Sequence, residues 1–233
     1  MTANTNISVC IGYTNRSYEN MARVEGRTIK RHTPGANIRL VRCQDKGYRK
    51  NMGTRFDAYV DKSADWVLAL DADSLCFGDL TPIISRAETE GFEFLGRHSG
   101  RPRRAPRSFN RQGYRQLFEQ AGMNALPLHV PNVFLVRGCH SAKLAELATR
   151  WTERLYETKT HVLGRPLWSD QVAFSLALAE LRLLPERLGF FRGIEVSDWG
   201  RARRMSRRPT IAHFGGRRWR RLWSQGRILG LTR

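Results

Sequence analysis

The segment WVLALDADSLCFGDL, residues 66–80, decides how the rest of the chain is interpreted. Its first five residues are apolar, as in a strand that is buried on both faces of a sheet. They run directly into Asp71 and Asp73, with only Ala72 between the two acids. A buried strand that ends in two carboxylates has three explanations: a surface turn, a phosphatase nucleophile or a site for a cation.

Strand-like and helix-like segments alternate along the chain. Apolar or alternating patterns predict strands at residues 7–13, 37–43, 66–70, 92–96, 132–138 and 210–214. Helical spacing occurs at residues 16–32, 50–63, 141–157 and 169–181, with Ser141 and Ser169 as the expected N-caps of the last two. The alternation predicts one α/β domain with a largely parallel sheet, residues 1–216, followed by a basic C-terminal tail, residues 217–233.

The two aspartates suit a divalent cation. Ligands of open α/β sheets bind beyond the carboxyl ends of the strands, and this pair follows such an end. In an extended chain, residues two apart point to the same side, so Asp71 and Asp73 converge while Ala72 faces away. Mg²⁺ and Mn²⁺ prefer a few carboxylates together with water and phosphate oxygens. The pair therefore predicts a cation that neutralises charge on a diphosphate.

The position of the pair separates two enzyme classes. In phosphatases of the haloacid dehalogenase type, the first aspartate is a nucleophile that ends the first strand and precedes Gly-Thr or a similar pair. Here two predicted strands come before Asp71, and Ser74 and Leu75 follow the pair. This order favours a nucleotide-sugar glycosyltransferase, in which a nucleotide-binding half precedes the metal-binding acids.

The sequence resembles glycosyltransferases of the GT-A fold, especially family 8, which includes glycogenin-like and lipooligosaccharide galactosyltransferases. The likeness rests on four segments in the family's order, WVLALDADSLCFGDLTPI, PNVFLVRG, WSDQVAFSLAL and IAHFGGRRW. It implies a GT-A (nucleotide-diphospho-sugar transferase) fold with a mixed, mostly parallel sheet flanked by helices. It also implies transfer of a sugar, with retention, from a nucleotide-diphosphate donor, which we expect to be a UDP-sugar, to a carbohydrate or lipid-linked acceptor.

The resemblance assigns roles to individual residues. Asp71, Asp73 and His213 would bind Mn²⁺ or Mg²⁺. Asp170 and Gln171 would lie at the reacting anomeric carbon, and Asp170 would be the base if the reaction inverts. The other residues assigned to the donor are Gly12, Tyr13, Arg55, Ala72, Asn132 and Gly216. The family's lysine near the diphosphate is missing, and Arg217 or Arg218 would replace it.

Each of these residues also has a purely structural explanation. His213 stands between Ala212 and Phe214, as a buried core histidine would. Asp170 would favour a helix N-terminus through the helix dipole. Asn132 follows a proline and suits a turn, and Arg55 suits the solvated side of a helix. The residues alone therefore leave these roles open.

Charge points to a polyanionic partner. The 40 Lys and Arg residues outnumber 21 Asp and Glu residues, giving a formal charge of +19. The excess lies in residues 97–115, 201–209 and 217–233. The tail mixes arginine with tryptophan and leucine, as in segments that lie on an anionic membrane, and the 97–115 loop suits an acceptor. The alternative is a basic protein on a degenerate fold that binds nucleic acid or a membrane surface, although no nucleic-acid motif supports the former.

The expected location is the cytoplasm, peripherally on the inner face of the membrane. The N-terminal residues lack a basic and apolar signal peptide, and no apolar stretch approaches the ~20 residues of a membrane-spanning helix. Cysteine spacing matches neither zinc ligands nor a redox pair, so we expect reduced, buried thiols. The cysteines are Cys10, Cys43, Cys76 and Cys139.

Overall fold

The computed structural model describes residues 5–43, 55–98, 129–157, 161–162, 165–166, 170–183 and 185–215. In these residues the main sheet has six strands in the order β2-β1-β3-β6-β5-β9. Only β6 runs against the other strands of this sheet. The strands are β1 (Ile7–Tyr13), β2 (Asn37–Arg42), β3 (Trp66–Asp71), β5 (Phe94–His98), β6 (His129–Arg137) and β9 (Leu188–Phe190). The predicted α/β fold with a mixed, mostly parallel sheet is confirmed.

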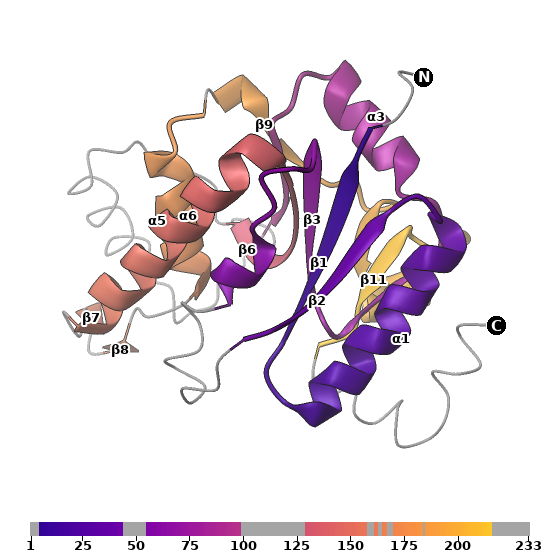
Figure 1. The fold of residues 1–233 in the computed structure, drawn as a ribbon, viewed down its shortest axis with the longest axis horizontal. Helices are drawn as coiled ribbons and strands as arrows, with labels where there is room; N and C mark the ends of the chain where they lie inside the picture. The colour runs from indigo at the N-terminus through magenta and orange to yellow at the C-terminus, as the bar shows by residue number, and fades with distance from the viewer. Residues whose placement is uncertain are drawn as a thin grey trace.

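Helices cover both faces of this sheet. Helix α1 (Arg16–His32) lies on one face, and α5 (Gly138–Glu157) and α6 (Asp170–Glu180) lie on the other (Figure 1). Leu68 and Leu70 of β3 belong to the core on the α1 side, whereas Val67 and Ala69 belong to the core with α5 and α6. Because successive residues face opposite layers, β3 must be apolar at every position until it ends at Asp71.

A second, three-stranded sheet follows the acid pair. Strand β4 (Ser74–Cys76) begins directly after Asp73 and pairs antiparallel with β11 (Ile211–His213). Strand β10 (Val196–Asp198) pairs parallel with β11 on its other side. Pairing with β11 therefore brings a late segment of the chain to the end of β3. The remaining elements are η1 (Phe56–Tyr59), α3 (Thr81–Thr89), β7 (His161–Val162), β8 (Arg165–Pro166), η3 (Pro185–Arg187) and α7 (Trp199–Ala202).

The predicted start of α5 is wrong. The helix begins at Gly138, so Ser141 lies inside its first turn and is not the N-cap. The Ser141 Oγ donates a hydrogen bond to the Gly138 carbonyl (2.8 Å). A Cβ atom at Gly138 would lie 1.9 Å from the Ala64 carbonyl oxygen. Glycine lets the chain pass close to the loop before β3 and turn into the helix earlier than the serine suggested.

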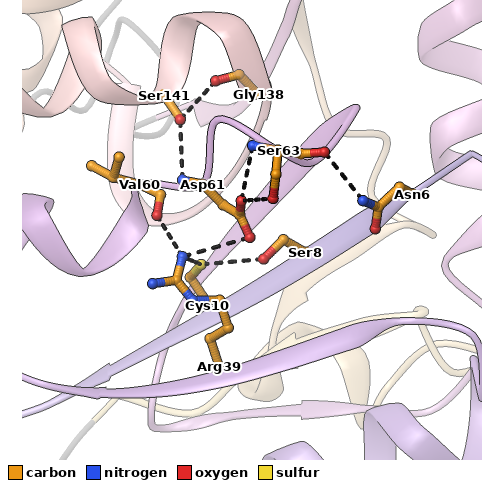
Figure 2. Close-up of polar contacts among 9 residues, drawn as sticks. All are labelled: Asn6, Ser8, Cys10, Arg39, Val60, Asp61, Ser63, Gly138 and Ser141. Carbon is orange, nitrogen blue, oxygen red and sulfur yellow. Dashed lines mark hydrogen bonds and ion pairs between the residues drawn. The ribbon is translucent and has the colours of Figure 1, made fainter.

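The predicted helix over residues 50–63 is also only partly present. In its described part, residues 55–63, only the 3₁₀ turn η1 is helical. Figure 2 shows how the loop between η1 and β3 is held: Asp61 Oδ1 accepts hydrogen bonds from Ser63 N (3.1 Å) and Ser63 Oγ (2.7 Å). Asp61 N donates to Ser141 Oγ (3.2 Å), and Arg39 Nη1 lies 3.6 Å from Asp61 Oδ2. These contacts tie the loop to α5 and β2, and so hold η1 beside the end of β3.

Other sequence-based expectations are tested only in part. In the described residues no helix is long and apolar enough to span a membrane. Gly216, Ser169, the tail over residues 217–233 and most of the basic loop over residues 97–115 lie outside the described residues, so the domain boundary stays a prediction. All four cysteines are free, but Cys139 is exposed, contrary to the expectation of buried thiols.

Candidate metal and donor site

Three predicted metal ligands converge at the end of β3. Asp71 is the last residue of β3, and His213 is the last residue of β11. The ligand atoms of Asp71, Asp73 and His213 all lie within 4.8 Å of one another. The chain turns at Ala72 and Asp73 and does not continue as an extended strand. The convergence of the two carboxylates is as predicted, but a turn produces it.

The small sheet positions His213. Its backbone pairs with Ser74 of β4, the residue after the second acid. The next backbone amide, of Phe214, donates a hydrogen bond to the Asp73 carbonyl oxygen (2.9 Å). These bonds aim the imidazole at the acids, and His213 Nε2 lies 3.2 Å from Asp73 Oδ1. Both ring nitrogens of His213 face carboxylates, as in a metal ligand and also in a satisfied core histidine, so its role as a ligand stays a prediction.

The carboxylate of Asp71 has a cation and a hydroxyl as neighbours. Arg55 Nη2 lies 3.3 Å from Asp71 Oδ1, and Tyr59 Oη donates a hydrogen bond to the same oxygen (3.3 Å). Gly12 pairs with Asp71 in the sheet, and a Cβ atom at Gly12 would lie 3.1 Å from Tyr59 Oη and 3.4 Å from Cys43 Sγ. A side chain at Gly12 would therefore push Tyr59 away from the acid.

Tyr13 and Ala72, two other residues assigned to the donor, are next in sequence to Gly12 and to the two acids. Tyr13, the last residue of β1, is half-buried, and its carbonyl accepts a hydrogen bond from Cys43 N (2.7 Å). Ala72 is 3% exposed, and its side chain belongs to the core on the α1 side. Ala72 can therefore meet a ligand only through its backbone.

A second set of polar contacts links His213 to Asn132. Asp198 Oδ1, at the end of β10, lies 3.5 Å from His213 Nδ1 and 2.8 Å from Arg97 Nη2. Arg97 Nη1 in turn donates a hydrogen bond to the buried Asn132 Oδ1 (3.2 Å). Sequence reasoning missed both Asp198 and Arg97 as site residues. Arg97 was counted only as the start of a basic cluster, and no motif distinguishes Asp198.

The carboxylates around His213 change its protonation. Burial alone would lower the pKa of His213, but hydrogen bonds to Asp198 and Asp73 and the charges of Asp73 and Asp71 outweigh it and raise the pKa to about 9. The hydrogen bond from His213 lowers the pKa of Asp198 to about 2, against the opposing effect of burial and with help from Arg97. Without a cation, His213 is protonated at neutral pH, and its Nε2–H group faces Asp73 while its Nδ1–H group faces Asp198.

A buried glutamate lies behind the site. Glu25 of α1 is 0% exposed, and neither of its carboxylate oxygens has a hydrogen-bond partner in the described part of the chain. Burial, and then the charges of Asp73 and Asp71, raise the pKa of Glu25 well above its ordinary value. The glutamate is therefore held as a neutral acid over a wider pH range than a solvated one.

The predicted catalytic pair can be located only by its backbone. Asp170 is the first residue of α6, and Gln171 follows it, as the sequence pattern predicts. The side chains of both residues lie outside the described part of the structure. Their assignment to the reacting carbon therefore stays a prediction.

The mixed sheet, the small sheet after the acid pair and the helices on both faces define the GT-A fold. No family model and no curated protein matches the sequence. Similar solved structures include the galactosyltransferase LgtC in complex with donor and acceptor sugar analogues, with 13% identity, a TM-score of 0.54, and coverage of 90% of this chain and 87% of LgtC.

Two further structures share the fold. Mouse xyloside xylosyltransferase 1, in its apo form, is 12% identical with a TM-score of 0.52, and the match covers 92% of this chain and 99% of the mouse chain. The bifunctional glycosyltransferase WbbM is 12% identical with a TM-score of 0.57, and the match covers 93% of this chain but only 47% of WbbM. At these identities the similarity establishes the fold.

Proposed function

We propose that this protein is a metal-dependent glycosyltransferase. It would move a sugar from a nucleotide-diphosphate donor, a UDP-sugar, to a carbohydrate or lipid-linked acceptor. The observation that carries the proposal is the convergence of Asp71, Asp73 and His213 at the carboxyl end of β3 in a GT-A fold. Similar solved proteins are themselves named galactosyl-, xylosyl- and glycosyltransferases, which supports the reaction class.

The three residues fit a small divalent cation. Octahedral Mg²⁺ holds its ligands at about 2.0–2.1 Å, which separates neighbouring ligand atoms by about 3 Å and opposite ones by about 4 Å. The 3.2 Å distance from His213 Nε2 to Asp73 Oδ1 matches neighbouring positions, and all three residues offer an atom within 4.8 Å of the others. Two carboxylates and an imidazole also suit Mn²⁺. When bound, the cation would stabilise negative charge on the leaving diphosphate.

The surrounding side chains would orient these ligands. Asp198 would accept a hydrogen bond from the Nδ1–H group of His213 and so leave Nε2 directed at the acids. Tyr59 and Arg55 fix one oxygen of Asp71. The guanidinium of Arg55 also supplies positive charge beside the acids, where the anionic donor would bind.

The remaining contacts follow the family resemblance. Gly12 and Tyr13 would lie near the nucleotide base, Asn132 would contact the donor sugar, and Gly216 would line the donor site. Asp170 and Gln171 would lie at the anomeric carbon, with retention of its configuration. If the reaction inverts instead, Asp170 is the proposed general base.

The cellular setting is part of the proposal. The protein would act in the cytoplasm, with its basic tail, residues 217–233, on the anionic inner face of the membrane, as in polysaccharide or lipopolysaccharide biosynthesis. A lipid-linked acceptor would then be presented at that surface. Nucleic acid is not the proposed partner.

The test is donor hydrolysis or transfer with and without Mn²⁺. We expect turnover of a UDP-sugar by the wild type to require the cation and to collapse in Asp71→Asn and Asp73→Asn. Glu153→Gln, which changes an exposed acid of α5, is the matched control and should retain activity. Turnover that is unaffected by EDTA and by both substitutions would refute the proposal. Phosphate release from a monoester with Asp71 as nucleophile would favour the phosphatase, and salt-sensitive DNA binding without donor binding would favour a binding protein.

A further inference from the structure

A surface cavity of about 480 Å³ lies at the far end of the small sheet from the candidate metal site. Its walls come from α3, the residues after β4, and the segments before β10 and β11. Phe77 and Thr210 line it and are joined by a backbone hydrogen bond of 2.8 Å. Four arginines also line it, and we call the cavity the arginine pocket. They are Arg86, Arg192, Arg207 and Arg208.

Two of the four arginines are neutralised within the pocket. Arg86 donates hydrogen bonds to both carboxylate oxygens of Glu195 (2.6 and 2.8 Å) and to Glu90 (2.8 Å). Arg192 donates to Glu90 (2.8 Å). The third acid of the wall, Asp79, accepts hydrogen bonds from two threonine hydroxyls and a backbone amide. Arginine therefore neutralises Glu90 and Glu195, whereas neutral donors hold Asp79, which keeps its negative charge.

The other two guanidinium groups have no carboxylate partner in the part of the chain that the structure describes. Arg207 and Arg208 are exposed, and neither forms an ion pair there. The Arg208 guanidinium lies over the ring of Phe77, 5.2 Å from its centroid. Ile194 also lines the pocket, and among the described residues it is the one large hydrophobic side chain that is exposed (39%). The four arginines and three acids of the lining leave a net charge of +1, beside an apolar wall.

We propose that the arginine pocket binds a phosphate monoester carried on a sugar or on a group of similar size. Guanidinium groups bind phosphate oxygens through paired, charge-assisted hydrogen bonds, and two adjacent arginines match the charge of a phosphate dianion. Phe77 and Ile194 offer a surface for the organic part of the ligand. The volume is in the range of pockets that hold small organic ligands.

The pocket is connected to the candidate metal site. Thr210 at the pocket directly precedes β11 and lies three residues before His213 at the metal site, which is about 10 Å in extended chain. The rings of Phe77, Trp199 and Phe214 stack over the same interval, with centroid distances of 6.2 and 4.8 Å. The idea that the pocket holds a phosphorylated acceptor rests on the proposed glycosyltransferase function. The binding of a phosphate monoester in the pocket does not depend on that function.

Calorimetric titration without donor or cation tests the proposal. The probes are glucose 6-phosphate with glucose as its neutral control, and vesicles of phosphatidic acid in phosphatidylcholine with pure phosphatidylcholine as theirs. We expect the Arg207→Gln, Arg208→Gln double variant to lose about tenfold or more in affinity for the phosphate probes. The control is Arg203→Gln with Arg204→Gln, which removes two exposed arginines of the same segment outside the pocket.

The outcomes are distinguishable. Loss of glucose 6-phosphate binding only in the pocket variant supports a soluble phosphate ester as ligand. If the pocket variant, and not the control variant, loses binding to phosphatidic acid vesicles but not to glucose 6-phosphate, the phosphate monoester is a lipid headgroup. Equal losses in the two double variants, or no binding of either probe at millimolar concentration, would overturn the proposal. Because no donor is present, failure of the glycosyltransferase proposal leaves this result unaffected.

Discussion

His213 should make the stability of the cation-free protein depend on pH. Its pKa is about 9 in the folded protein and 6.5 in an ordinary histidine. Below pH 6.5 the proton is bound in both folded and unfolded states, so the full stabilisation is present. Between pH 6.5 and about 9 the unfolded chain has lost the proton while the folded protein keeps it, so stability falls as pH rises. The shift corresponds to about 3 kcal/mol of free energy of unfolding.

Urea unfolding at several pH values between 6 and 9.5 measures this contribution. The experiment compares wild type and His213→Gln in EDTA, because groups common to both proteins cancel in the difference. We expect the wild-type advantage to shrink by about 3 kcal/mol across this range, and saturating Mg²⁺ to weaken the dependence because the cation replaces the proton. Parallel pH curves for the two proteins would refute the assignment of this proton to His213.

Three further substitutions test the surroundings of the site and the fold. Asp198→Asn should weaken Mn²⁺ binding by about 10–100-fold in a calorimetric titration, whereas the control Glu153→Gln should bind as the wild type does. An unchanged affinity in Asp198→Asn would show that Asp198 does not orient His213 for the metal. Because the pKa of Glu25 is raised in the folded protein, the stability of the wild type should fall as pH rises above 4.5. The free energy of unfolding of Glu25→Gln should therefore increase relative to the wild type by up to about 1.4 kcal/mol per pH unit in that range. Parallel pH curves in urea unfolding would contradict this. Gly138→Ala should lower the free energy of unfolding by about 1–3 kcal/mol or more, as measured with urea. The control Gly35→Ala, which has open space around it, should lower it little. Equal losses in the two variants would rule out the contact with Ala64 as the cause.

Local signals in the sequence were enough for the elements before the acid pair. Strand β1 and helix α1 have the predicted bounds. The Asn15 side chain accepts hydrogen bonds from Ser17 N and Tyr18 N at the start of α1, a capping pattern that depends only on neighbouring residues. The apolar run of β3 also predicted burial on both faces. These features follow from periodicity and capping, which are properties of a short window.

Long-range pairing was beyond such signals. Strands β4, β10 and β11 have three residues each and form only because they pair with one another. That pairing brings Asp198 to His213, and the contacts of Arg97 extend the set of polar contacts to Asn132. The hydroxyl of Tyr59 was missed for a similar reason, since an aromatic residue in an amphipathic segment suggests core packing. The ordered family segments could predict His213 itself, but not the residues that orient it.

We propose that Asp71, Asp73 and His213 together hold a cation that binds a nucleotide-sugar diphosphate. Thermal unfolding with UDP-, GDP- and CMP-sugars, each with Mn²⁺ or EDTA, tests it most directly. A donor at 100 times its dissociation constant should add about 2.7 kcal/mol, or a rise in Tm of about 5–10 °C, in the wild type with Mn²⁺. We expect no such rise for the UDP-sugar in EDTA or in Asp73→Asn. An equal rise in EDTA and in Asp73→Asn, or no rise with any nucleotide sugar, would contradict it.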